Sequence, residues 1–157
     1  MIKKNSKLSI LSSLILSILV GFTHMAQAEE TDLNQFLWDN RLLLVFTPNI
    51  GDPRLGAQIK ELRQNTCGVQ ERDMLVFQIV KDLNVLTFND RILPFDGQKL
   101  RETYRVENDT FATILIGKDG AEKLRSSKAI SVSNVFDTID AMPMRQDEME
   151  SRINACG

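Results

Sequence analysis

The chain has 157 residues, of which 21 are acidic and 19 basic, and its first 28 residues are expected to be removed on export. Three lysines lie in that stretch, so the mature chain of 129 residues carries 16 basic and 21 acidic side chains and a formal charge of −5. This charge argues against nucleic acid and anionic membrane surfaces as partners. The only histidine, His24, also precedes residue 29, which excludes a Ser-His or Cys-His pair and an imidazole metal site from the mature protein.

The export signal is indicated by its three parts. A basic segment precedes an apolar stretch over residues 8–22, and Ala26-Gln27-Ala28 then matches the small-x-small cleavage rule. We expect cleavage after Ala28 and a periplasmic or secreted protein with no stable membrane span, the alternative being an uncleaved N-terminal anchor. The length of 29–157 predicts a single domain, whose tail over 144–157 is flexible or helical.

The first half of the mature chain contains two apolar runs of strand length, over 42–46 and 74–80. Continuous apolar runs of this kind predict strands that are buried on both faces. A helix between them would complete a parallel βαβ unit. The lead-in over 31–40 is expected to be helical or irregular, and its Trp38 is expected to pack into the core.

A helix is predicted directly after the first strand. Asp52 is a candidate N-cap, and Pro53 can occupy the first helical position, where a missing N–H costs nothing. Apolar residues at helical spacing continue this helix to about Thr66. Gly68 is the expected stop signal.

The second half of the chain predicts shorter elements that are separated by turn residues. Lys118-Asp119-Gly120 is expected to form a hairpin turn, because Asp-Gly supplies backbone positions with positive φ. The predicted elements are a small hairpin over 85–93, a helix over 97–105, strands over 111–117 and 121–126, and a last helix that starts near Ser131 or Ser133 and is ended or kinked by Pro143.

This order of elements predicts an α/β domain of thioredoxin-like fold. Two parallel strands and an antiparallel hairpin would form a central mixed sheet of about four strands. Helices would cover both faces of that sheet, because its strands are apolar on both sides.

Three runs of sequence resemble a known family: RLLLVFTPNIGDPR over 41–54, ILIGKDGAEKLRSS over 114–127 and IDAMPMRQDEM over 139–149. Together they are similar to the bacterial exported domain-of-unknown-function family 4174, and the resemblance covers about Asn34 to Met149. It implies a fold similar to thioredoxins and peroxiredoxins. It also implies similarity to a domain of vertebrate secreted sushi-repeat and equarin-type matrix proteins. A shared fold does not by itself imply an activity.

The first of these runs ends where thioredoxin-like enzymes carry their reactive cysteine. In the thioredoxin register, Gly51 and Arg54 occupy the two cysteine positions. In the peroxiredoxin register, Asp52 occupies the threonine position and Leu55 the cysteine position. Both registers lack the thiolate that disulfide exchange and peroxide attack require, which argues against an enzyme of either kind.

The same turn is the candidate binding site. Backbone amides at the N-terminus of a helix favour anions, although Asp52 as a cap would occupy some of them and repel other anions. No metal site and no cofactor are expected. The candidate binding residues are Thr47, Pro48, Asn49, Asp52 and Arg54.

Charged residues outside this turn are expected to be ordinary surface residues. The acidic ones are scattered over turns and do not have the spacing of a calcium loop. The basic ones in the second half are expected on solvated faces of their elements, namely Arg101, Arg105, Lys123 and Arg125.

Two cysteines, Cys67 and Cys156, remain after removal of the signal. An oxidising location permits a disulfide between them, and two free thiols are the alternative. Cys67 is expected at the C-terminal end of the first helix, where the helix dipole raises the pKa of a thiol. A structural role is therefore favoured over a reactive one.

Two functions follow as hypotheses. The first is a non-catalytic binding or accessory module of the cell envelope, whose partner is an unknown envelope or extracellular protein. The second is a divergent thiol-dependent oxidoreductase or antioxidant protein that uses Cys67, alone or with Cys156. The first is favoured because both registers lack the nucleophile. Assays of peroxide consumption and insulin-disulfide reduction discriminate between the two.

Overall fold

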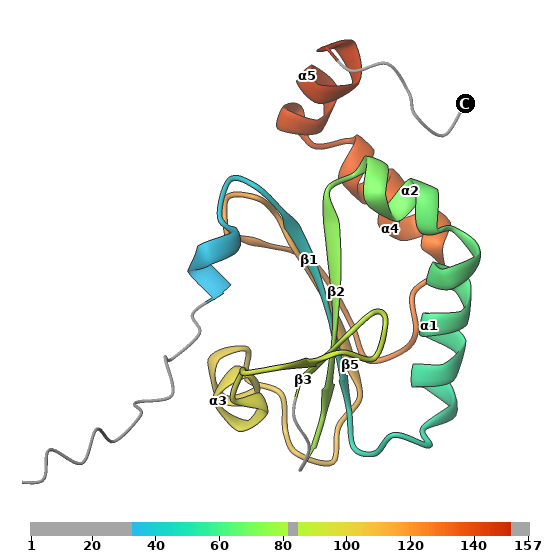
Figure 1. Ribbon diagram of the computed structural model, residues 1–157, viewed down its shortest axis with the longest axis vertical. Coiled ribbons are helices and arrows are strands. Elements are labelled where there is room, and N and C mark those ends of the chain that lie inside the picture. Colours follow the sequence, from blue (N-terminus) through green and yellow to red (C-terminus); the bar gives the residue numbers. More distant parts are fainter. Residues whose placement is uncertain (1–32, 82–84, 152–157) are drawn as a thin grey trace, which may run out of the picture.

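The computed structural model describes residues 33–81 and 85–151, which form one mixed sheet with helices on both faces (Figure 1). The predicted signal peptide over 1–28 and Cys156 lie outside the described residues. The strands are β1 Arg41–Thr47, β2 Met74–Val80, β3 Val85–Thr87, β4 Ile92–Leu93, β5 Ala112–Ile116 and β6 Glu122–Ser126. The helices are the 3-10 helix η1 Leu33–Phe36 and the α-helices α1 Pro53–Gln64, α2 Thr66–Glu71, α3 Gly97–Thr103, α4 Val132–Asp140 and α5 Pro143–Ser151.

The strand order in the sheet is β4-β3-β2-β1-β5-β6. β1 runs parallel to β2 and antiparallel to β5, with Leu44 opposite Phe77 on one side and Ile114 on the other. The predicted α/β class and the parallel βαβ unit are thus confirmed. The predicted number of about four strands is too low, because the small hairpin of β3 and β4 pairs with β2 and extends the sheet to six strands.

Every residue of β1 is buried, because the strand has a neighbour on each side and helices over both faces. Side chains alternate between the two faces of a strand. Leu43 and Val45 pack with α1, α2 and α4, whereas Leu42, Leu44 and Phe46 pack with α3 and η1 on the opposite face. Figure 1 shows these two layers, with α1 and α3 on opposite sides of the sheet. The continuous apolar run is therefore explained by burial on both faces.

Side-chain caps fix where three helices begin. Asp52 accepts from the backbone N–H of Arg54 at the start of α1, and Asp96 accepts from two backbone N–H groups at the start of α3. The cap of α4 is Ser131 rather than Ser133, since the Ser131 hydroxyl accepts from the N–H of Asn134. These caps satisfy donors that a helix leaves unpaired at its first turn.

The prediction that Trp38 packs into the core is wrong. Its side chain is 65 % exposed, and its backbone has a φ of 68°, in the left-handed region. The chain turns there into β1, and the Trp38 N–H donates to the carbonyl oxygen of Lys118 at 2.7 Å. The apolar side of the lead-in is supplied instead by Leu33 and Phe36, which pack against the core.

The helix stop predicted at Gly68 is also wrong. α1 ends at Gln64, and α2 then runs through Gly68. A Cβ atom at position 68 would lie 2.6 Å from Cε2 of Phe136 on α4. Glycine is needed there because α2 and α4 approach closely, and not because a helix ends.

Candidate functional site

The turn that follows β1 is held together by its own side chains. Thr47, the last residue of β1, is fully buried, and its hydroxyl donates to the carbonyl oxygen of Asn49 at 2.8 Å. Pro48 is partly buried, whereas Asn49 and Gly51 are exposed. Of the predicted binding residues at the start of this turn, Thr47 therefore supports the turn, and Asn49 is the one open to solvent.

Asp52 and Arg54 close the N-terminus of α1. Asp52 Oδ1 accepts from the Arg54 backbone N–H at 2.8 Å and from Nε at 2.9 Å, and Oδ2 accepts from Nη2 at 2.6 Å. Hydrogen bonds from the Arg54 side chain hold the pKa of the Asp52 carboxyl below its ordinary value. The Arg54 guanidinium also lies 4.7 Å above the ring of Phe111. The positive end of the helix is therefore already occupied by an ionised carboxylate of the chain.

The positions that the two enzyme registers assign to cysteine are unsuited to a thiol reaction. Leu55, at the peroxiredoxin position, lies on the buried face of α1 and packs into the core. Gly51 and Arg54, at the thioredoxin positions, are exposed, and Arg54 is bound to Asp52. The turn thus keeps the backbone form of a strand-to-helix junction while lacking a nucleophile at each of these positions.

Arg101 lies beneath the turn, and sequence reasoning missed it. The prediction of a solvated face is wrong, since the residue is 1 % exposed. Its Nη2 donates to the carbonyl oxygens of Thr47 and Ile79, at the ends of β1 and β2, at 2.7 and 3.3 Å. Its Nη1 donates to Glu107 O at 2.9 Å. One guanidinium therefore joins the C-terminal ends of both parallel strands to the loop after α3, where the turn begins.

A groove of about 430 Å³ runs beside the turn, between α1 and the hairpin of β3 and β4. Its volume lies in the range of small ligand sites, about 300–1,000 Å³. Ile50 of the turn is 58 % exposed at one end of it. The groove is lined by Ile50, Leu55, Gly56, Ile59, Lys60, Arg63, Gln64, Gln78 and Asp90.

Asp90 fixes the wall of the groove that lies opposite α1. The residue sits in the turn of the hairpin with a φ of 58°. Its carboxylate accepts from Gln78 Nε2 at 3.1 Å and from Arg63 Nη2 at 2.8 Å. Gln78, buried on β2, also donates to the carbonyl oxygen of Thr87 at 2.9 Å. The hairpin is thus bound both to the sheet and to α1, and the groove between them has a defined width.

The prediction that Cys67 lies at the C-terminal end of the first helix is wrong, because α1 ends at Gln64 and Cys67 lies in the first turn of α2. The residue is exposed and apart from the turn after β1. α1 has 12 residues, so the helix between the two sites is about 18 Å long at 1.5 Å per residue. Because Cys156 lies outside the described residues, pairing of the two cysteines stays a prediction. The structure brings Thr47, Asp52 and Arg54 together and places Cys67 on α2, beyond the C-terminal end of α1.

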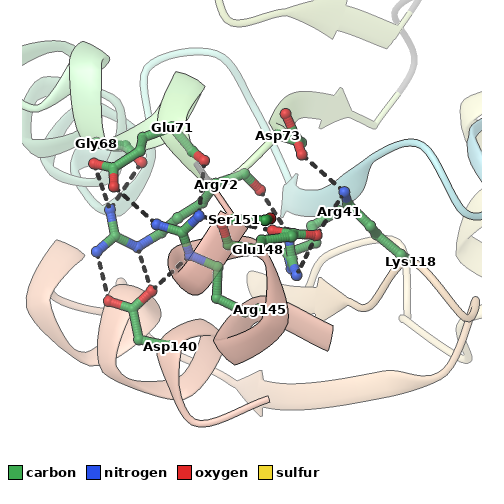
Figure 2. A network of polar contacts seen from close by, with 10 residues as sticks. All are labelled: Arg41, Gly68, Glu71, Arg72, Asp73, Lys118, Asp140, Arg145, Glu148 and Ser151. Atoms are coloured by element: carbon green, nitrogen blue, oxygen red, sulfur yellow. Dashed lines mark hydrogen bonds and ion pairs between the residues drawn. The ribbon is translucent and has the colours of Figure 1, made fainter. Parts of the chain in front are cut away.

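A second polar cluster lies at the opposite end of β1, where α5 packs (Figure 2). Arg145 of α5 is 1 % exposed, and it binds Asp140 and Glu71 at 3.1 and 2.9 Å. Arg72 binds Asp140 as well, with its guanidinium 4.1 Å above the ring of Phe136. The ionic groups of the cluster are the cations of Arg41, Arg72, Lys118 and Arg145 and the anions of Glu71, Asp73, Asp140 and Glu148.

This cluster explains why two of the motif runs carry so many charged residues. Lys118 comes from the second run, and Asp140, Arg145 and Glu148 come from the third. Each of these side chains has an opposite charge within 4 Å, so none offers an uncompensated charge to a ligand. We assign the cluster to the attachment of α5, and leave the turn and its groove as the candidate site.

Two features are absent from the described ranges 33–81 and 85–151. These ranges contain no group of three or more His, Cys, Asp or Glu side chains that could hold a metal ion. No helix in these ranges is long and apolar enough to cross a membrane.

The sequence matches a family model described as Domain of unknown function (DUF4174) over residues 32–148. Sushi repeat-containing protein SRPX of Rattus norvegicus is 30 % identical over 120 residues, which cover 74 % of this chain and 26 % of that protein. Sushi repeat-containing protein SRPX2 of Mus musculus is 26 % identical, covering 77 % of this chain and 26 % of that protein. The chain thus spans about a quarter of the length of these relatives.

The fold resembles solved peroxiredoxins. The reduced 2-Cys peroxiredoxin of Plasmodium vivax matches with a TM-score of 0.56 and 19 % identity, over 73 % of this chain and 84 % of that chain. The mitochondrial 2-Cys peroxiredoxin of Plasmodium falciparum matches with a TM-score of 0.53 and 15 % identity, over 80 % and 86 %. This likeness confirms the predicted thioredoxin-like fold and carries no activity with it. Because the family model spans most of the sequence, the chain belongs to the DUF4174 family of domains of unknown function.

Proposed function

We propose that this chain is an exported, non-catalytic binding domain on a peroxiredoxin-like scaffold. The observation that carries the proposal is the closure of the α1 N-terminus by Asp52 and Arg54. In a thiol enzyme this place must stabilise a thiolate, and a helix N-terminus does so with its positive end. Here a carboxylate with a lowered pKa occupies that end and would repel a second anion.

The groove beside the turn supports a binding role. It combines an apolar floor, formed by Leu55 and Ile59, with polar groups that fix its walls. An apolar site with a few fixed polar groups is the usual form of a binding pocket. The exposed Ile50 at its end gives an approaching partner an apolar contact.

The redox assays test this proposal against the thiol-dependent alternative. Purified protein is assayed for peroxide consumption with dithiothreitol as reductant and for insulin-disulfide reduction, beside a 2-Cys peroxiredoxin and a thioredoxin as positive controls. We expect no turnover above that of a Cys67→Ser variant. Turnover that is lost in Cys67→Ser would establish the oxidoreductase and overturn the binding proposal.

Export is tested separately, by expressing the full chain and sequencing the N-terminus of the protein recovered outside the cytoplasm. We expect the sequence to begin at Glu29, after cleavage at Ala28. An intact N-terminus in the cytoplasmic fraction would contradict export. An intact N-terminus in the membrane fraction would favour the uncleaved anchor.

A further inference from the structure

We propose that the groove between α1 and the β3–β4 hairpin binds an extended peptide segment of another protein, in which an acidic residue neighbours an apolar one. This inference rests on the proposed binding function and names the chemistry of the ligand. It is carried by three observations on the groove: an unexplained glycine, a lysine that has no ion-pair partner among the described residues, and an exposed isoleucine.

The glycine is Gly56, which lies inside α1 and lines the groove. Glycine in a helix interior is unfavourable relative to alanine, because the unfolded chain has more conformational freedom to lose. At most positions, close packing within the protein explains such a glycine, as it does at Gly68. A Cβ atom at Gly56, however, would meet nothing within 4 Å, so the fold itself gives no reason for glycine there.

A missing side chain on an exposed helix face allows the backbone of another molecule to come close. Gly56, Lys60 and Arg63 are spaced at i, i+4 and i+7, so they share one face of α1. The gap at Gly56 therefore opens directly onto the groove between that face and the hairpin. The distance from Gly56 to Arg63 is about 10 Å along the helix, which matches about three residues of extended chain.

The charges in the groove select the ligand. Arg63 is neutralised by Asp90, whose carboxylate lies 2.8 Å from Nη2. Lys60 is exposed and has no ion-pair partner among the described residues. The lining thus carries one uncompensated positive charge, which favours a carboxylate on the ligand.

The apolar contacts lie next to this charge. Ile50 at the end of the groove and the floor of Leu55 and Ile59 would receive an aliphatic or aromatic side chain. Backbone approach at Gly56 would place such a side chain between Ile50 and Lys60. The expected segment therefore presents an apolar side chain to Ile50 and an acidic one to Lys60.

A selection of random heptapeptides displayed on phage tests the inference, with four immobilised proteins as baits. The wild-type protein is compared with Gly56→Gln, which fills the gap, and with Lys60→Glu, which reverses the charge. The matched control is Ala57→Gln, which adds the same side chain at an exposed neighbour that does not line the groove. Thermal melts confirm that all four baits are folded. The selected peptides are then synthesised, and their Kd values are measured by fluorescence anisotropy.

We expect peptides selected on the wild type to contain an apolar residue beside Asp or Glu. Their affinity should fall at least about tenfold in Gly56→Gln and Lys60→Glu and less than about twofold in Ala57→Gln. Lys60→Glu should select Lys or Arg in place of the acid. Peptides that bind Gly56→Gln as well as they bind the wild type, or a selection without an acidic preference, would overturn the inference. The peptide selection and the redox assays are independent experiments. A failed selection would overturn the inference about the ligand, whereas only turnover that depends on Cys67 would overturn the proposed function.

Discussion

Glu148 on α5 accepts hydrogen bonds from both terminal guanidinium nitrogens of Arg41, the first residue of β1, at 3.1 and 3.3 Å. Lys118 Nζ lies 2.7 Å from the same carboxylate. These contacts join the last helix to the first strand and to the turn after β5. Since Arg145 is the only buried residue of α5, ionic contacts rather than an apolar face attach this helix to the domain.

Replacement of Glu148 by glutamine should destabilise the protein by about 3 kcal/mol, because it leaves the buried Arg41 without its carboxylate partner and leaves Lys118 with Asp73 alone. Urea unfolding followed by circular dichroism measures the change. The control is Glu150→Gln, at an exposed position of the same helix, which should stay within about 0.5 kcal/mol of the wild type. Equal effects of the two variants would show that the Arg41–Glu148 contact does not stabilise the fold.

The same cluster predicts how stability changes with pH. Burial would raise the pKa of Glu148 and of Asp140, but hydrogen bonds from Lys118 and Arg41, and from Arg72 and Arg145, lower both pKa values overall. A lowered pKa in the folded state gives stability that is complete above the ordinary value, 4.5 for glutamate, and is lost as the pH falls through the folded value.

We therefore expect the melting temperature to change little between pH 7 and pH 6 and to fall in the acid range below the ordinary pKa values. Glu148→Gln should reduce the steepness of that acid fall, because one of the titrating groups is then absent. Calorimetric melts of both proteins over the same buffers provide the measurement. Parallel curves for wild type and variant would argue against Glu148 as a source of the pH dependence.

Arg101 is expected to stabilise the C-terminal ends of the central strands β1 and β2, where the turn begins. Arg101→Met removes the donors to the carbonyl oxygens of Thr47, Ile79 and Glu107, and should cost more than about 3 kcal/mol, given about 1.5–3 kcal/mol for each hydrogen bond to a charged group. Arg91→Met, the same change at an exposed position, should be nearly neutral. Chemical denaturation of the two variants compares them directly, and a small loss for Arg101→Met would contradict this role.

The sequence predicted those features that local signals determine. β1 follows from its apolar run, the start of α1 from Asp52-Pro53, and the hairpin from Asp119-Gly120, where Gly120 has a φ of 76°. Each depends on neighbouring residues alone, so the pattern of the chain is sufficient.

Features that depend on distant partners could not be predicted. The sequence predicts a solvated face for Arg101 and a tail position for Arg145, because charged side chains are seldom fully buried. Their burial depends on partners 54 and 74 positions away, namely Thr47 and Glu71. The groove likewise forms only when the β3–β4 hairpin is placed against α1. The turn was identified as the candidate site, but its neighbouring groove required the tertiary structure.

The free energy of unfolding should fall more when the capping residue Asp52 loses its side-chain oxygens than when it loses only its charge. Asp52→Ala loses the acceptor for the Arg54 N–H and should cost about 1–2 kcal/mol. Asp52→Asn keeps an acceptor and should recover most of that loss, because the partly exposed ion pair with Arg54 contributes little by itself. Thermal denaturation of both variants tests this order. A larger loss in Asp52→Asn than in Asp52→Ala would contradict it.

Replacement by alanine should stabilise the protein at Gly56 and destabilise it at Gly68. Gly56→Ala should raise the free energy of unfolding by about 0.5–1 kcal/mol, because alanine is the better helix former and its Cβ meets open space. Gly68→Ala gains the same propensity but places Cβ 2.6 Å from Phe136, and overpacking of this kind costs about 1–3 kcal/mol. Since propensity acts equally at both sites, the difference between the two variants in urea unfolding measures packing alone. Stabilisation by both would contradict the close approach of α2 and α4, and destabilisation by Gly56→Ala would contradict the open face on which the peptide site depends.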